Sequence, residues 1–128
     1  MLNKEIASAV LRDGGITLDY ATNKPNHARG FYVSRPGFEI RLSREIVQEC
    51  ASAASSSAEK VWDASLSYVA YRAFPDAYIG AWLDGAFVYL DVTDWFAICE
   101  EAVNAGIERG QLCIFDIENE TTIELKAR

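Results

Sequence analysis

Two apolar runs joined by Asp84-Gly85 constrain the fold of this chain more than any other feature of its sequence. The runs cover residues 77–82 and 87–92. Asp-Gly favours the tight turn of a β-hairpin, because this turn needs backbone conformations that few other residue pairs adopt without strain. The three segments together predict a pair of antiparallel strands.

Residues alternate in character along the second run, which indicates a strand with two different faces. One face consists of Val88, Leu90 and Val92. The other consists of Phe87, Tyr89 and Asp91. We expect the aliphatic face to point into the core. Large aromatic residues beside a carboxylate on an outer face suit an interface, so a symmetric homodimer through Phe87 and Tyr89 is one expectation. Coverage of this face by a helix is the alternative.

Turn and capping signals divide the rest of the chain. Helices are predicted over residues 3–12, 44–53, 58–74 and 94–109, and short strands over 16–20, 31–34, 38–42, 111–117 and 121–125. Pro36-Gly37 suits a type II turn and predicts a hairpin of the strands on either side of it. The expected helix N-caps are Ser43 for the second helix, Ser57 for the third, and Thr93 or Asp94 for the fourth.

The order of these elements indicates an α+β fold, because strands and helices do not alternate regularly and several strands are hairpin neighbours. We predict a single domain over 1–128 with a mostly antiparallel sheet of five to seven strands. Two main helices, 58–74 and 94–109, pack on the sheet. Gly106 lies on the apolar face of the second, where it lets a neighbouring element approach closely. The first carries a buried stripe of Trp62, Leu66, Val69, Ala70 and Ala73.

Composition and charge exclude several classes of protein. Half of the 128 residues are hydrophobic, which excludes a disordered chain. Twelve basic and nineteen acidic residues give a net charge of −7, which argues against a general nucleic-acid binder. No apolar run is long enough to cross a membrane, and the N-terminus does not resemble a signal peptide. With three widely spaced cysteines, these features predict free thiols and a cytoplasmic protein.

Familiar catalytic motifs are missing from the sequence. It contains no Walker loop and no GxGxxG, GxSxG or HExxH motif. Cys50, Cys99 and Cys113 lack the spacing of a metal site, and the last two are expected to be buried in apolar elements. The single histidine, His27, falls in a polar loop over 21–29, where an exposed side chain is expected. We therefore expect no cofactor, no metal ion and no catalytic residue.

Acidic residues gather in the C-terminal part of the chain. Residues 73–128 carry three basic and eleven acidic groups, net −8, whereas residues 1–72 carry nine basic and eight acidic groups, net +1. The seven-residue spacing of Asp94, Glu101 and Glu108 predicts an exposed ridge on the fourth helix, with carboxylates roughly 10 Å apart. The predicted partner-binding set is Asp94, Glu100, Glu101, Glu108, Glu118 and Glu120.

A carboxylate site is the alternative to a docking ridge. Asp91 and Asp116 each lie late in a predicted strand, and they would meet if those strands paired. Tyr89 and Arg35 are the expected neighbours, and a divalent metal is an optional ligand. Such a pair would make the chain a small enzyme or a ligand-binding domain.

Part of the chain resembles a pattern in small uncharacterised proteins of bacteria and their phages or plasmids. The pattern joins a YxGxW strand, an Asp-Gly turn and a VYLDV strand to a helix, a further strand and an acidic hairpin. The matching positions, all within 78–125, are Tyr78, Gly80, Trp82, Asp84, Gly85, Val88, Tyr89, Leu90, Asp91, Val92, Ala102, Gly106, Gln111 and Asp116. The resemblance implies a place on a mobile element and an accessory or anti-defence role, and it assigns no catalytic residue.

Charge and resemblance together predict a non-enzymatic binding protein. It would inhibit a host complex that serves defence or handles nucleic acids by occupying a basic surface, as anti-CRISPR-type inhibitors do. It would contact neither nucleic acid nor membrane directly. Docking of this kind is electrostatic and weakens with salt.

Overall fold

The computed structural model describes residues 2–19 and 27–126. Tyr20 and most of the loop predicted over 21–29 lie outside the described residues. None of the described helices is long and apolar enough to span a membrane. The elements are, in chain order, α1 (Asn3–Asp13), β1 (Gly15–Asp19), β2 (Phe31–Ser34), β3 (Ile40–Ser43), α2 (Arg44–Ala51), α3 (Ser56–Ala73), β4 (Tyr78–Asp84), β5 (Phe87–Phe96), α4 (Cys99–Glu108), β6 (Cys113–Asp116) and β7 (Thr121–Glu124).

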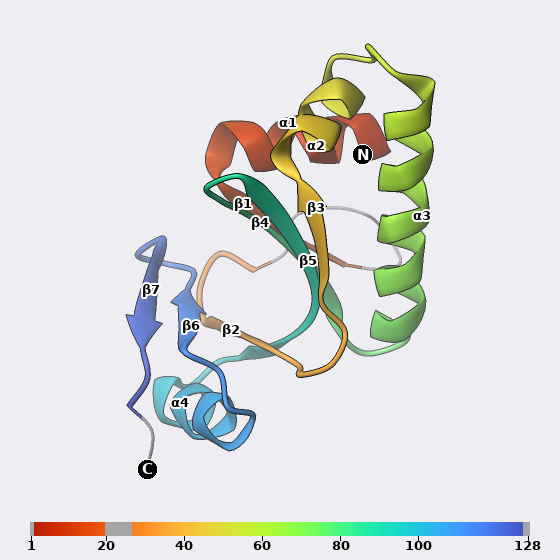
Figure 1. The fold of residues 1–128 in the computed structure, drawn as a ribbon. Helices are drawn as coiled ribbons and strands as arrows, with labels where there is room; N and C mark the ends of the chain where they lie inside the picture. Colours follow the sequence, from red (N-terminus) through yellow and green to blue (C-terminus); the bar gives the residue numbers. More distant parts are fainter. Residues whose placement is uncertain (1, 20–26, 127–128) are drawn as a thin grey trace.

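The described strands form one seven-stranded antiparallel sheet, which confirms the predicted α+β fold. Their order is β1-β4-β5-β2-β6-β7, and β3 also pairs with β5. β4 and β5 pair along their length around the Asp84-Gly85 turn, so the predicted hairpin is confirmed. Figure 1 shows α1, α2 and α3 above and to the right of the sheet, β6 and β7 at its left-hand edge, and α4 below.

β5 is the central strand because its ten residues serve two partners on one edge. Its first half pairs with β3 and its second half with β2. β2 and β3 therefore both pair with β5, and the predicted hairpin between them is wrong. Between the two strands the Arg35 amide donates to the Val92 carbonyl oxygen at 2.8 Å. A long strand offers each four-residue strand a continuous partner, whereas an isolated hairpin of two such strands is marginal.

Two hydrophobic clusters lie on the same face of the sheet. In the larger one α1, α2 and α3 pack against β1, β4 and β5, and the predicted stripe of α3 is buried except at Ala70, which is partly buried. Trp62 is fully buried there, and its indole donates to the Asn3 carbonyl at 2.8 Å. In the smaller cluster α4 packs on β2 and β6. A Cβ at Gly106 would overlap Leu125, which confirms the predicted close approach.

The three predicted helix caps agree with the structure in one case and differ in two. Ser43 caps α2, and its hydroxyl accepts from the Ile46 amide at 3.3 Å. α3 is capped by Ser55 through the Ala58 amide, so the predicted cap at Ser57 is wrong. α4 begins at Cys99, five residues later than predicted, because β5 continues through Phe96 in its pairing with β2. Cys99 is consequently exposed, which corrects the expectation that it is buried.

Candidate ligand-binding cleft

The two hydrophobic clusters under the helices lie on the first face of the sheet, and the candidate site lies on the second. In β5 the even-numbered residues Val88 and Leu90 belong to the main core, so alternation turns the odd-numbered residues to the second face. Phe87 is only partly buried and belongs to neither hydrophobic cluster, so the expectation that it is simply buried under a helix is wrong. Arg41 instead lies over the Phe87 ring, 4.4 Å from its centroid. The homodimer through Phe87 and Tyr89 stays a prediction.

Asp91 is a buried carboxylate on this second face, and its residue is 4% exposed. Its Oδ2 atom accepts hydrogen bonds from the Ser34 hydroxyl at 2.7 Å and from the Trp82 indole at 3.1 Å. Its Oδ1 atom is buried without a hydrogen-bond partner. Gly80 is the register partner of Asp91 in β4, and a Cβ at residue 80 would overlap Oδ1. The missing side chain at Gly80 therefore makes room for the carboxyl group.

The surroundings of Asp91 change its acidity. Burial raises the pKa of Asp91 to about 6, against the opposing effect of the hydrogen bonds from Ser34 and Trp82. Burial acts in this direction because a charged carboxylate loses its hydration in the protein interior. The charge of Glu39 raises the pKa of Asp91 further. A pKa of about 6 lies above the range of an ordinary aspartate, so Asp91 gains its charge only as the pH rises through about 6.

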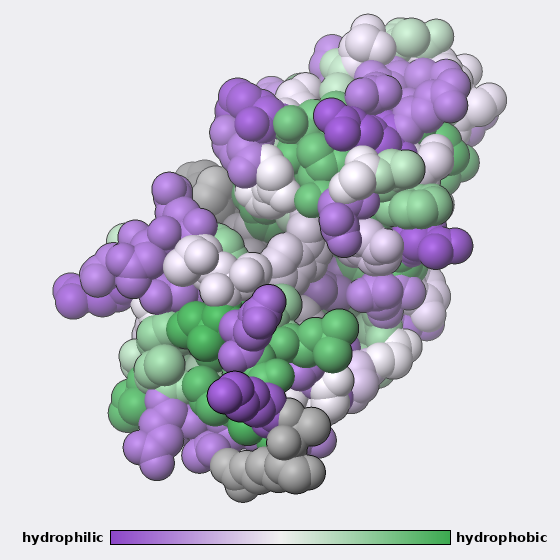
Figure 2. Space-filling model, turned by 60° about the vertical axis from the view of Figure 1, so that its left-hand side comes forward, coloured by the Kyte–Doolittle hydropathy of each residue, from purple (hydrophilic) through white to green (hydrophobic). Residues whose placement is uncertain are grey.

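A cleft of about 720 Å³ opens over Asp91. Trp82 and Phe115 meet edge to face in its lining, with ring centroids 6.3 Å apart. Figure 2 shows the left-hand side of Figure 1 turned forward, and pale residues of intermediate hydropathy cross the middle of this side between more strongly coloured regions. The volume suits a small organic ligand. The lining residues that bear on its chemistry are Thr17, His27, Tyr32, Gly80, Trp82, Asp91, Thr93 and Phe115.

His27 belongs to an aromatic cluster at this cleft. Its ring stacks on Trp95 with centroids 4.2 Å apart and meets Tyr78 edge to face at 5.2 Å. Its Nδ1 atom lies 3.2 Å from the Tyr32 hydroxyl oxygen. Burial lowers the pKa of His27, although the charge of Asp19 acts in the opposite direction. The expectation of an exposed loop histidine is therefore wrong, because aromatic rings from β2, β4 and β5 surround it.

Charged residues in the cleft lining are mostly acidic. Arg12 donates two hydrogen bonds to Asp13, at 2.9 and 2.8 Å, so this basic group is already paired. Glu120, from the turn between β6 and β7, also lines the cleft. Among the described lining residues, the carboxylates of Asp13, Asp91 and Glu120 thus stand against the one guanidinium of Arg12.

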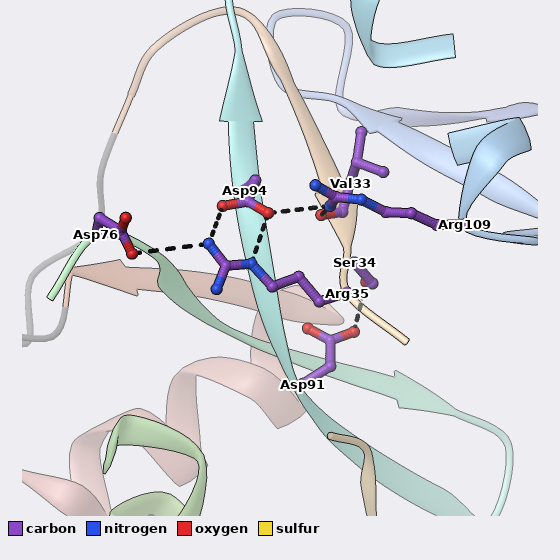
Figure 3. Close-up of polar contacts among 7 residues, drawn as sticks. All are labelled: Val33, Ser34, Arg35, Asp76, Asp91, Asp94 and Arg109. Carbon is purple, nitrogen blue, oxygen red and sulfur yellow. Dashed lines mark hydrogen bonds and ion pairs between the residues drawn. The ribbon is translucent and has the colours of Figure 1, made fainter. Parts of the chain in front are cut away.

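Arg35 and Asp94 form a separate polar cluster, shown in Figure 3. Arg35 donates to both carboxylate oxygens of Asp94, each at 2.7 Å. Arg109 also reaches Asp94, at 3.0 Å, and donates to the Val33 carbonyl at 3.2 Å. Asp76 lies 3.7 Å from Arg35. Burial alone would raise the pKa of Asp94, but the two arginines outweigh it and hold this pKa below its ordinary value. This cluster joins β5 to the β2–β3 link and to the end of α4.

The predicted acidic ridge therefore loses its first member. Asp94 lies on β5 and not on a helix, and its side chain is only 17% exposed. Two arginines neutralise its charge, so it cannot contribute to an open acidic surface. The other five predicted residues are exposed on α4 and in the β6–β7 turn: Glu100, Glu101, Glu108, Glu118 and Glu120. Their role in partner binding stays a prediction.

Asp116 does not join Asp91, so the predicted carboxylate pair is wrong. β2 lies between β5 and β6, and the register places Asp116 beside Phe31. The Asp116 carboxylate accepts two hydrogen bonds from Asn119 in the following turn, at 3.3 and 2.8 Å. Of the other predicted neighbours, Tyr89 shares the second face with Asp91, whereas Arg35 belongs to the Asp94 cluster.

Sequence reasoning missed the aromatic residues that line the cleft. Trp82 had a local signal, because the register set by the Asp84-Gly85 turn puts it on the same face as Asp91. Tyr32 and Phe115 had no such local signal. They come from β2 and β6, whose places in the sheet depend on pairings between distant parts of the chain.

No family model, curated protein or solved structure matches this chain. Within residues 2–19 and 27–126, no group of three or more His, Cys, Asp and Glu side chains is placed to hold a metal ion. What the chain does must therefore follow from the chemistry of its cleft and its surface.

Proposed function

We propose that this chain binds a small organic ligand in the Asp91 cleft, the cavity lined by Trp82, Asp91, Tyr32, His27 and Phe115. The observation that carries this proposal is a buried carboxyl group with one unpartnered oxygen at the cleft. A buried polar atom without a partner costs about 1–3 kcal/mol, and more if it is charged. A titratable group held at such a cost beside a cavity is typical of a functional site.

The cleft has the two kinds of surface that small-ligand sites combine. Aromatic rings offer flat apolar area to a ligand, and Trp82 contributes the largest of them. Polar groups that can orient the ligand come from neighbouring strands, with Thr17 of β1 next to Gly80 and Asp91 beyond it. A site built across strands of one sheet is held more rigidly than a site on loops.

A fragment screen followed by NMR tests this proposal. We expect fragments that contain an aromatic ring to shift the indole N–H signal of Trp82 and the amide signal of Gly80. The variant Thr17→Trp should abolish these shifts, because its larger side chain fills the space over Gly80. Thr17 is partly buried in the cleft lining and faces Gly80 in the register.

The matched control is Thr121→Trp, the same change at an exposed residue of β7 that does not line the cleft. It should bind fragments as the unmodified chain does. Unchanged binding by a folded Thr17→Trp variant, or shifts confined to residues outside the cleft, would contradict the proposal. Circular dichroism of both variants checks that they fold.

We propose a second function for the acidic surface formed by Glu100, Glu101 and Glu108. In this second proposal the chain acts in the cytoplasm as an inhibitor from a mobile element and occupies a basic surface of a host complex. The supporting observation is that Glu100, Glu101 and Glu108 are all exposed on the one short helix α4. The net charge of −8 over residues 73–128 adds to their field.

Charge reversal on α4 tests this second proposal. We expect Glu101→Lys with Glu108→Lys to lower the recovery of a bacterial partner by roughly tenfold, because like charges then face each other. Raising salt from about 0.05 to about 0.3 M should have a similar effect on the unmodified chain. The matched control is Glu5→Lys with Glu45→Lys, which reverses two exposed charges on α1 and α2. Equal recovery with both double variants would reject the acidic surface as the docking site.

A further inference from the structure

We infer that the ligand of the Asp91 cleft carries a positively charged nitrogen, as in a protonated amine. This inference rests on the proposed binding function and adds the chemical class of the ligand. Three features of the cleft support it: the balance of charges in its lining, the kind of rings that line it, and the state of the Asp91 carboxyl group.

The charge balance of the lining favours a cation. Asp13, Asp91 and Glu120 line the cleft, and Arg12 is the one Lys or Arg residue among the described lining residues. Arg12 is bonded to Asp13 through two nitrogen atoms, so these two charges offset each other and the carboxylates of Asp91 and Glu120 remain. A bound anion would meet uncompensated carboxylates, whereas a cation would be attracted by them.

The aromatic lining favours a cation for a different reason. The faces of aromatic rings carry partial negative charge, and Trp attracts cations more strongly than Tyr or Phe does. Trp82 donates its indole N–H to Oδ2 of Asp91 at 3.1 Å, which places the ring and the carboxylate side by side. A positive group in contact with this ring is therefore close to the carboxylate as well.

Asp91 adds a charge that water does not screen. Its Oδ1 atom is closed to solvent and accepts no hydrogen bond. Ser34 and Trp82 both donate to the other oxygen, Oδ2, so the charge of the carboxylate is only partly compensated. Interactions between charges are stronger where water is excluded, so a cation in the cleft stabilises the ionised form of Asp91. A neutral ligand such as an alcohol lacks this contribution.

Three probes with the same ring and different charges test the inference: benzylamine, benzyl alcohol and benzoate. Their dissociation constants are measured by NMR titration of the Trp82 indole signal in the full chain. We expect benzylamine to bind at least about tenfold more tightly than benzyl alcohol, and benzoate to bind most weakly. This ranking needs no variant, so it stands even if a substitution in the cleft disturbs folding.

Two variants then locate the preference. Asp91→Asn should reduce the ratio of the benzyl alcohol and benzylamine dissociation constants to about threefold or less, since it removes the buried charge. Glu108→Gln removes an exposed carboxylate of α4 outside the cleft, and it should leave the ratio unchanged.

The outcomes separate this inference from the function on which it rests. Equal binding of benzylamine and benzyl alcohol, or tighter binding of benzoate, would overturn the cationic ligand while leaving the cleft a binding site. A preference for benzylamine that survives in a folded Asp91→Asn variant would overturn the role assigned to the buried carboxylate of Asp91. If no fragment of any charge binds in the cleft, the proposed function itself is wrong.

Discussion

Replacing Asp91 by asparagine should stabilise the folded chain at about pH 8 and lose this effect by about pH 4. The pKa of Asp91 is raised by burial to about 6, from an ordinary value of 3.8. The folded state therefore binds a proton more tightly than the unfolded state. The stability that protonated Asp91 contributes is fully present below about pH 4 and is lost as the pH rises through about 6.

The expected size of the effect follows from this difference in pKa. A difference of one unit corresponds to about 1.4 kcal/mol, so the free energy of unfolding of Asp91→Asn, relative to the unmodified chain, should change by about 3 kcal/mol between the two pH values. Urea unfolding at a series of pH values measures it. Taking the difference between the two proteins removes the contributions of the other titrating groups.

Asp94→Asn is the matched control, because it makes the same chemical change three positions along β5. The arginines that bind Asp94 lower its pKa, against the effect of burial, so its contribution to stability has the opposite sign. It is present above about pH 4 and is lost as the pH falls further. If both variants showed the same pH dependence, or if Asp91→Asn showed none, the buried state of Asp91 would be contradicted.

The substitution Gly80→Ala should destabilise the chain by about 2 kcal/mol, because the added Cβ overlaps Oδ1 of Asp91 and forces the carboxyl group to move. In a chain that already carries Asp91→Ala, the same substitution should cost less than about 0.5 kcal/mol, since the overlapping atom is gone. The four proteins form a double-mutant cycle that urea unfolding can measure. Additive effects would mean that Gly80 does not make room for Asp91.

The same cycle reports on the cleft. An alanine at position 80 adds a methyl group to the floor beside Asp91, so Gly80→Ala should also weaken fragment binding. The double variant restores the packing but not the carboxylate. It should therefore regain binding of neutral fragments and not the preference for a charged nitrogen.

Local features of this chain could be predicted because they depend on residues close together in the sequence. The Asp84-Gly85 turn, the cap at Ser43 and the buried position of Trp62 each follow from a short segment and its periodicity. The α+β class follows from the order of such segments. Alternation in β5 also predicts that Asp91 and Leu90 point to opposite faces of the sheet, and the face of Asp91 is the one that bears the cleft.

The starts of helices and the pairing of strands were harder to predict from the sequence, because local interactions compete there with interactions between distant parts of the chain. Asp94 is a reasonable cap by its residue type, but Arg35 and Arg109 bind it within β5. The strands around Pro36-Gly37 look like a hairpin, but β5 is long enough to pair with both. In each case an interaction across a large separation in sequence outweighed the local preference.

Turns, caps and alternation can be predicted from short segments of the chain, and alternation places Asp91 on one strand face with Phe87 and Tyr89. The space at Gly80 and the burial of Asp91 beside it depend on how the strands pack together. The position of β2 between β5 and β6, which brings Tyr32 and Phe115 to the cleft, depends on pairing between distant segments. This difference arises because alternation is a property of neighbouring residues, whereas the order of strands depends on the free energy of all the pairings taken together.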